Sequence, residues 1–395
     1  MILNVIIALG IIGAANLAVY FLFPKYRRIA AIISRSFIGL LFMFSGFVKG
    51  VDPLGFTYKI EDYFIAYNME WAMGLAFSLS VIVCAMEFTA GALLFFNIKT
   101  KYNVWLVTLM MLGFTCITFY DALYSPVPDC GCFGDAIKLT NWETFYKNVV
   151  IDLFLVLIIL FRNNYNSFLK NKLELGAIAL VFISFLSFEI YNYRNLPIID
   201  FSSWKVGSKL YSDNPKPIKL FVKYKCKATG EVKEFLSPNY PYTDSIWLTQ
   251  WDYDTSRVED PNKYVNIMIE GKEGNDMTSA VIKNPDYQFI ITSYNLKLAN
   301  KESFKKISKL FEQIDSIGYS FVVLSSGFQE DFEKFKKDNN INEYLQFYNT
   351  DDIELKIMVR SNPGLMLIKN GTVLGKWHYN NIPSFEELQK ITNKK

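Results

Sequence analysis

Six long apolar runs dominate the first half of this chain and constrain its fold more than any other feature. They span roughly residues 3–23, 32–50, 71–97, 103–124, 145–162 and 173–191. Each run is close to the ~20 residues that a helix needs to cross a bilayer. Because the backbone must satisfy its own hydrogen bonds in a hydrocarbon core, these runs predict six transmembrane helices. The alternative, buried helices of a large soluble protein, fits poorly with so many runs joined by short loops.

The first run has the length of a signal peptide, but no basic segment precedes its apolar core. It continues to Phe23 and Pro24 without a clear small-residue cleavage site. We therefore expect residues 3–23 to stay in the protein as a membrane helix.

Charged residues divide the chain into two halves. Lys, Arg, Asp and Glu make up 26 of residues 1–195, or 13%, and 53 of residues 196–395, or 27%. The first half therefore suits a lipid bilayer, and the second half suits a soluble domain. The net charge of +3 gives no electrostatic reason to expect a nucleic acid partner. The single histidine, His378, excludes Ser-His-Asp hydrolases and histidine-rich metal sites.

The basic residues of the loops predict the orientation of the helices. Lysine and arginine dominate the loops after the first, third and fifth helices, whereas the other two loops hold four lysines among many acids. Positively charged loops stay in the cytoplasm, so both chain termini and the loop between the fourth and fifth helices should lie outside. In a bacterium this predicts an inner (cytoplasmic) membrane protein, with both termini and its soluble half in the oxidising periplasm.

Two acidic residues lie inside predicted helices, Glu87 in the third and Asp152 in the fifth. Charged groups at such a depth are costly and usually face the interior of a bundle or a cavity. Lys49 lies near the end of the second helix, where Gly46 and Gly50 have the GxxxG spacing that permits close helix approach. Two interpretations stay open: a polar cavity that contains Glu87 and Lys49, or hydrogen bonds that merely join helices.

Cys130 and Cys132 lie one residue apart in the stretch DCGCFGD, between the fourth and fifth helices. On the oxidising side of a membrane such a pair can form a disulfide, and so small a ring favours a labile, exchanging bond. The pair could instead be a static cross-link of its loop. A metal site would need more ligands, and only Asp129 and Asp135 are near, so no metal is predicted. A redox-active pair is the favoured interpretation.

The other three cysteines are less informative. Cys84 and Cys116 lie within predicted membrane helices, and we expect them to be packing residues. Cys226 is a lone external cysteine, either a free thiol or a partner that resolves a mixed disulfide.

Three stretches carry a resemblance to a known family: LGFTY after Lys49, MEFTAGALL around Glu87, and especially DCGCFGD at Asp129–Asp135. They resemble the DoxX/MauE group of redox-associated membrane proteins over residues ~30–165. This resemblance implies a four-helix membrane core, with the first and sixth helices as additions to it. It also implies quinone-coupled oxidation of thiols or sulfur, and disulfide formation in partner proteins.

The second half predicts two further parts. Residues 195–260 have the pattern of short β-strands, in KPIKLFVKYK, ATGEVKEFLSP and NYPYTDSIWL. Residues 261–395 alternate strands such as QFIITSY and YSFVVLSSG with amphipathic helices, and they include a hairpin turned at Asn370–Gly371. We expect an α/β sheet with helices on its faces.

The order of elements in residues 261–395 resembles thioredoxin-like domains of the TlpA/peroxiredoxin kind. Asn362-Pro363, before the hairpin, corresponds to the cis-proline of that family. However, the family's active cysteines should follow QFIITSY, and no cysteine occurs after Cys226. A thiolate nucleophile is therefore excluded there. The resemblance implies a docking domain in which Asn362 and Pro363 contact a peptide of a partner.

Two functions follow from these parts. The first is a membrane thiol-disulfide oxidoreductase, in which Cys130 and Cys132 take electrons from thiols of periplasmic or envelope proteins. A quinone bound near Glu87 and Lys49 would then accept them. The second is a non-enzymatic scaffold or binding subunit of an envelope complex, in which the cysteine pair only cross-links its loop. The Cys-Gly-Cys spacing favours the first function, and the cysteine-free C-terminal domain favours the second.

Overall fold

The structure is a computed structural model that describes residues 2–165, 167, 171–212, 216–259, 265 and 267–392. It divides into two compact units. The first comprises Met1–Ser202, Val359–Gly364 and Trp377–Pro383, and the second comprises Ser203–Met358, Leu365–Lys376 and Ser384–Lys395. The expected boundary between residues 260 and 261 and the last three residues of the chain lie outside the described residues.

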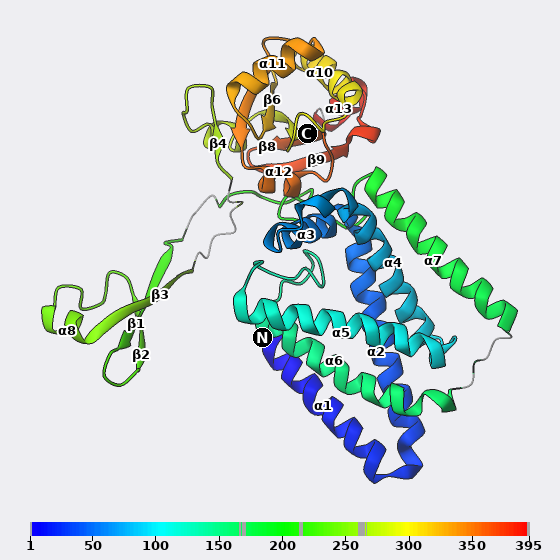
Figure 1. Cartoon of the computed structure of the whole chain (residues 1–395). Coiled ribbons are helices and arrows are strands. Elements are labelled where there is room, and N and C mark those ends of the chain that lie inside the picture. The colour runs from blue at the N-terminus through cyan, green and yellow to red at the C-terminus, as the bar shows by residue number, and fades with distance from the viewer. Residues whose placement is uncertain are drawn as a thin grey trace. The chain divides into compact units, whose positions relative to one another are not determined.

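Six long helices build the first unit, as the apolar runs predict (Figure 1). They are α1 (Ile2–Leu22), α2 (Arg27–Val51), α4 (Ala76–Phe95), α5 (Thr100–Tyr124), α6 (Asn141–Phe161) and α7 (Asn171–Arg194). Each is long and apolar enough to cross a membrane. Helix α2 contacts α1, α4 and α6, and α7 packs against α4. The chain is therefore a membrane protein with a helical N-terminal bundle.

Helices α2 and α4 approach each other at glycines. A Cβ atom added to Gly39 would lie 2.7 Å from the Phe95 nitrogen, and one added to Gly91 would lie 2.6 Å from the Met43 nitrogen. No side chain fits at such distances, so the two backbones are in direct contact. Gly46 meets α4 in the same way, which confirms the close approach expected there.

Helix α3 (Pro53–Ala66) is not predicted by the apolar runs, because its sequence mixes charged and apolar residues. Its first turn carries two standard signals for a helix start. Pro53 occupies the first turn, and the Asp52 carboxylate accepts a hydrogen bond of 2.9 Å from the Gly55 nitrogen. Through α3 and the short 3-10 helix η2 (Glu70–Leu75), the chain passes from α2 to α4.

A three-stranded antiparallel sheet begins the second unit. Its strands are β1 (Lys219–Cys226), β2 (Val232–Leu236) and β3 (Trp251–Glu259), in the order β2-β1-β3. The expected strand in NYPYTDSIWL is wrong, because Ser245–Gln250 forms the short helix α8. Asp244 caps this helix by accepting hydrogen bonds from the nitrogens of Ile246 and Trp247, and this local bond outweighs the apolar pattern.

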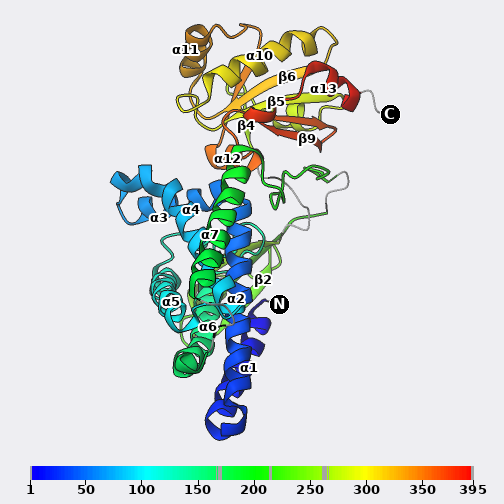
Figure 2. The ribbon, with the colours of Figure 1, turned by 90° about the vertical axis from the view of Figure 1, so that its right-hand side faces the viewer.

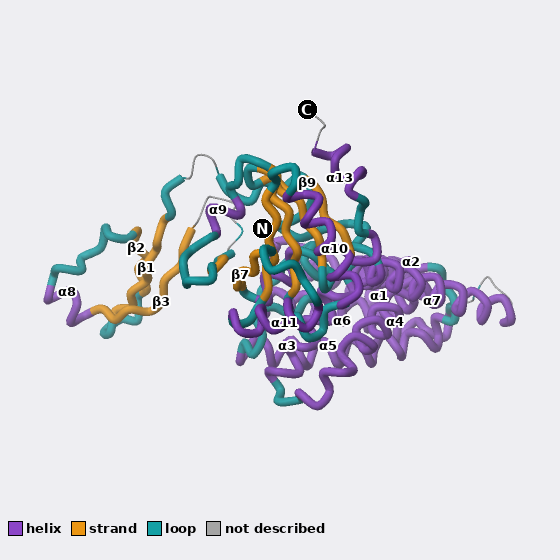
Figure 3. Tube along the Cα trace, turned by 90° about the horizontal axis from the view of Figure 1, so that it is seen from above, coloured by secondary structure: helices purple, strands orange, loops and turns teal. Residues whose placement is uncertain are grey.

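A separate six-stranded sheet follows (Figure 3). Its strands are β4 (Ile269–Glu270), β5 (Tyr287–Ser293), β6 (Ser320–Ser325), β7 (Gln346–Thr350), β8 (Gly364–Lys369) and β9 (Thr372–His378), in the order β4-β7-β6-β5-β8-β9. Strands β5, β6 and β7 are parallel, and β4 pairs antiparallel with β7. Strands β5 and β6 match the predicted strands QFIITSY and YSFVVLSSG, whereas β7 is not predicted from the sequence.

Helices cover this sheet, as expected. They are α9 (Thr278–Ile282), α10 (Lys301–Asp315), α11 (Gln329–Asn339), α12 (Asp352–Met358) and α13 (Phe385–Thr392). Figure 2 shows α10 and α11 on one face of the sheet and α12 on the other. The turn of the β8–β9 hairpin lies at Asn370–Gly371, where both φ angles are positive, and this confirms the predicted turn. The expected cis bond at Asn362-Pro363 is also present.

Candidate functional site

The Cys-Gly-Cys loop joins α5 to α6, and its path depends on glycine. Gly131 has a φ of +64°, in the left-handed region that side chains disfavour. A Cβ atom there would also lie 2.9 Å from Cγ of Lys59. The turn places the sulfur atoms of Cys130 and Cys132 2.6 Å apart, as two free thiols. The loop therefore brings the two thiols together.

Helix α3 lies against this loop and holds it in place. The Lys59 ammonium pairs with the carboxylate of Asp129, the residue before Cys130, at 3.1 Å. One turn later, the Tyr63 hydroxyl donates a hydrogen bond of 2.6 Å to Asp121 on α5. Burial and this hydrogen bond raise the pKa of Tyr63, so Tyr63 keeps its proton. The helix thus links the loop to α5.

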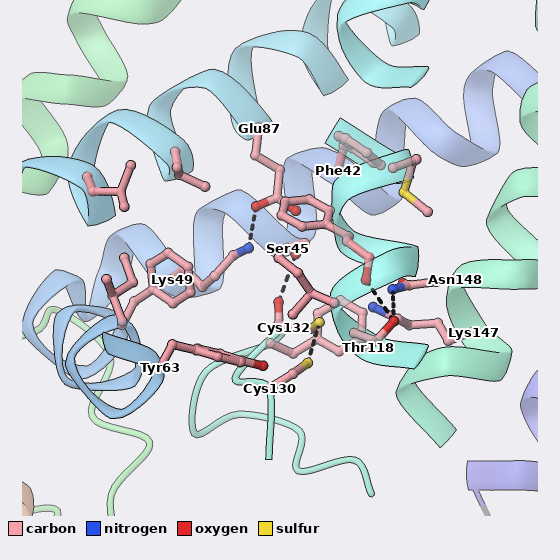
Figure 4. Close-up of a pocket in the computed structure, with 18 of the residues that line it drawn as sticks. Phe42, Ser45, Lys49, Tyr63, Glu87, Thr118, Cys130, Cys132, Lys147 and Asn148 are labelled. Carbon is pink, nitrogen blue, oxygen red and sulfur yellow. Dashed lines mark hydrogen bonds and ion pairs between the residues drawn. The ribbon is translucent and has the colours of Figure 1, made fainter. Parts of the chain in front are cut away.

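A cavity of about 310 Å³ opens beside the two thiols. Most of its lining is apolar or aromatic. Its wall contains Lys49 from α2, Glu87 from α4, and both Cys130 and Cys132 from the loop (Figure 4). Four residues predicted from three distant stretches of sequence therefore line one cavity, and this is the candidate site.

Lys49 and Glu87 form an ion pair on the cavity wall, with side chains 4% and 5% exposed. Each charge compensates the other, which is what permits two ions to be buried among apolar side chains. The Lys49 ammonium also lies 4.9 Å from the centre of the Phe56 ring. Beside the pair, the Ser45 hydroxyl donates a hydrogen bond of 2.8 Å to the carbonyl oxygen of Cys132.

The two thiols have different electrostatic surroundings. The hydrogen bond from Cys130, then the positive charges of Lys147 and Lys49, lower the pKa of Cys132 to about 6 against the effect of burial. The same hydrogen bond and burial raise the pKa of Cys130. In the reduced pair, the thiolate form is therefore favoured at Cys132 over Cys130.

The remaining sequence-predicted residues lie outside the cavity wall. Asp152 accepts a hydrogen bond of 2.9 Å from Thr115, so it joins α6 to α5. Cys84 is fully buried and packs against Phe185, as expected, whereas Cys116 is exposed and the expectation of packing is wrong for it. Among the described residues, no three metal-ligating side chains form a group.

Asn362 and Pro363 lie in the returning segment Val359–Gly364 of the first unit, and neither lines the cavity. In this segment the Arg360 guanidinium pairs with Asp52 at 2.8 Å and with Asp135 at 3.0 Å. Asp135 ends the DCGCFGD stretch, so Arg360 holds that end of the loop to the start of α3. The contact of Asn362 and Pro363 with a partner stays a prediction.

The polar residues of the cavity wall that the sequence does not predict include Ser45, Tyr63 and Lys147. Ser45 and Tyr63 have no signal, because hydroxyl groups are common in membrane helices and loops. Lys147 does have one, since it lies within the apolar run at 145–162 and is a buried-charge candidate like Glu87.

The comparison with protein families supports part of the expected resemblance. The family model described as methylamine utilisation protein MauE matches residues 27–162, which contain α2 to α6 and the Cys-Gly-Cys loop. Over this third of its length, the chain is a MauE-like membrane protein. The resemblances to DoxX and to thioredoxin-like domains stay predictions. No curated protein and no solved structure matches the chain.

Proposed function

We propose that this protein is a membrane thiol-disulfide oxidoreductase that carries electrons from thiols of envelope proteins to a membrane quinone. One observation supports the proposal above all others. The two thiols and the Lys49–Glu87 ion pair line the same apolar cavity. A cysteine pair that only cross-linked its loop would not need such a cavity beside it.

The first step is thiol-disulfide exchange with a partner protein. A partner thiolate attacks the Cys130–Cys132 disulfide and forms a mixed disulfide, and the second partner thiol, as its thiolate, then releases the pair. The partner loses two electrons and becomes a disulfide. Cys130 and Cys132 gain these two electrons and become the reduced pair.

The second step returns the pair to its oxidised form, and the cavity fits a quinone as the acceptor. Its volume of about 310 Å³ is at the lower end of the range for small-molecule sites. The aromatic lining suits a planar apolar ring, and the Lys49 ammonium supplies hydrogen-bond donors. Glu87 would hold the Lys49 ammonium at the wall. As the Cys130–Cys132 disulfide forms again, a bound quinone would accept the two electrons of the pair, with one proton from Cys130 and one from solvent.

The remaining parts serve this reaction in the proposal. On the basis of the loop charges we propose that the Cys-Gly-Cys loop and both termini lie in the periplasm of a bacterium, with the bundle in the inner membrane. The cysteine-free C-terminal domain, which we propose to be thioredoxin-like, presents the partner protein. Asn362 and Pro363, in the returning segment of the first unit, are the proposed partner contacts.

Trapping of mixed disulfides tests the function. In Cys130→Ala or Cys132→Ala, the remaining cysteine should hold a partner in a mixed disulfide, seen as a band that disappears on reduction. Cys116→Ala is the matched control, because this cysteine lies outside the cavity. The wild-type pair should also become reduced when the quinone is depleted from membranes. If neither variant traps a partner and the pair never changes redox state, the proposal fails. Partners that remain bound to both variants in a pull-down would instead support a scaffold.

A further inference from the structure

The charges on the cavity wall do not balance. Lys49 is compensated by Glu87, which among the described residues is the only carboxylate that lines the cavity. Lys147, from α6, also lines it, and within the described part of the chain Lys147 forms no ion pair with a carboxylate. The wall therefore carries one uncompensated positive charge in a mostly apolar setting. Because Lys147 is half-buried, an anion near it would stabilise this charge.

Lys147 lies close to the cysteine pair. Its ammonium is 4.8 Å from the centre of the ring of Phe133, the residue that directly follows Cys132. Figure 4 shows Lys147 beside Asn148 and Thr118, on the same cavity wall as the two sulfur atoms. The contact with the Phe133 ring keeps the flexible lysine at the loop rather than in solvent.

The other ionisable groups around the pair come from the loop and from three helices or their ends. Lys49 of α2, Glu87 of α4, and Tyr63 and Tyr67 of α3 and its end line the cavity with Cys130. Beside Cys130, Asp129 is neutralised by its ion pair with Lys59. Glu87 is neutralised by Lys49, and Tyr63 keeps its proton through its hydrogen bond to Asp121. Of the groups that line the cavity, a thiol of the pair is therefore the one left to carry the compensating negative charge.

We infer that Lys147 is a positioning residue for the redox reaction, which holds Cys132 as the thiolate of the reduced pair while Cys130 keeps its proton. The lowered pKa of Cys132 and the raised pKa of Cys130 agree with this assignment. The role rests on the proposed function. It also goes beyond that function, because it defines which sulfur carries the charge and which residue stabilises it.

The assignment changes the proton balance of the proposed reaction. The disulfide takes up two electrons and one proton, and it yields the Cys130 thiol and the Cys132 thiolate. Without Lys147 the reduced pair would bind two protons near neutral pH. A tenfold change in proton concentration corresponds to about 30 mV per proton in a two-electron couple. The potential of the pair should therefore fall by about 30 mV per pH unit in the wild type.

The test measures alkylation of the reduced full-length protein in detergent against pH, with mass spectrometry of the Cys132 peptide. In the wild type the midpoint should lie near the pKa of Cys132, about 6. Lys147→Met should raise the midpoint by about one pH unit or more, because the cation is lost. Lys147→Arg should restore it. Lys138→Met is the matched control, because Lys138 belongs to the Cys-Gly-Cys loop but its side chain is 72% exposed. That control should leave the midpoint unchanged.

A second measurement keeps the inference testable if Lys147→Met does not fold. Between about pH 6 and the raised midpoint, Lys147→Gln should steepen the pH dependence of the potential of the pair to about 60 mV per pH unit, which corresponds to two protons. An unchanged midpoint in Lys147→Met, or an equal shift in Lys138→Met, would overturn the inference even if the pair cycles with quinone. A shifted midpoint in a pair that never cycles would instead keep the role of Lys147 and reject the proposed function.

Discussion

Lys49 and Glu87 place two full charges inside a membrane bundle, where an isolated ion costs several kcal/mol. Their side chains are almost completely buried, so water does little to screen them. The pair is therefore stable only as a pair. This makes it a sensitive probe of whether α2 and α4 have the register that the structure shows.

Removal of one partner of the Lys49–Glu87 pair should lower the free energy of unfolding much more than removal of both. Lys49→Met should lower the free energy of unfolding by about 3–5 kcal/mol, because it leaves the Glu87 charge buried without compensation. The double variant Lys49→Met/Glu87→Gln should recover most of this loss, since no charge stays buried. Unfolding of the purified protein in detergent measures both. Losses that simply add would show that the two residues do not act as a pair.

At the scale of elements, glycine determines how closely α2 and α4 approach. Gly91 contacts the backbone of α2 near Met43, and there is no space for the side chain of a larger residue. The approach also controls the site, because α2 carries Lys49 and α4 carries Glu87. A wider spacing would therefore separate the ion pair as well as the helices.

Gly91→Ala should destabilise the bundle by about 1–3 kcal/mol, the usual cost of an inserted group in a close-packed interface. Gly113→Ala, in α5, is the matched control, because a Cβ atom there meets nothing within 4 Å. Alanine favours helix more than glycine does, so this control should be neutral or slightly stabilising. Thermal unfolding of the two variants in detergent compares them. Equal unfolding temperatures of the two variants would contradict the close contact of the α2 and α4 backbones.

Helices α3 and α8 show the limits of pattern analysis at this scale. Neither has a long apolar run, and each starts at an aspartate, Asp52 or Asp244, that caps it through local hydrogen bonds. A single capping bond is a weak signal in sequence. Yet α3 supplies both Lys59 and Tyr63 to the Cys-Gly-Cys loop and its surroundings.

At the scale of the whole molecule, the orientation in the membrane decides whether the cysteine pair meets an oxidising compartment. A membrane-impermeant maleimide should label Cys226 in intact spheroplasts. A cysteine placed at the start of α5, next to the loop after α4, by Lys101→Cys should react only after lysis. The Lys101→Cys variant should be tested in a chain from which the other cysteines have been removed by substitution. Labelling of the Lys101→Cys site in intact spheroplasts would contradict the predicted orientation.

The sequence by itself determined the parts of this protein that depend on neighbours along the chain. The six membrane helices follow from the length of their apolar runs, and the turn at Asn370–Gly371 follows from residues that accept positive φ. The spacing of Cys130 and Cys132 likewise made a redox pair a reasonable hypothesis. Local hydropathy and backbone preference are enough for such features.

Only the tertiary structure decided which side chains meet. Lys49, Glu87, Cys132 and Lys147 come from α2, α4, the loop and α6, and one cavity joins them. The sequence marks Lys49 and Glu87 as buried-charge candidates, but it does not show that they pair or that Lys147 lacks a carboxylate. Helices far apart in sequence converge only through packing, which at Gly39 and Gly91 brings two backbones into contact. The charge balance of a cavity is therefore a property of the packed bundle and not of any one segment.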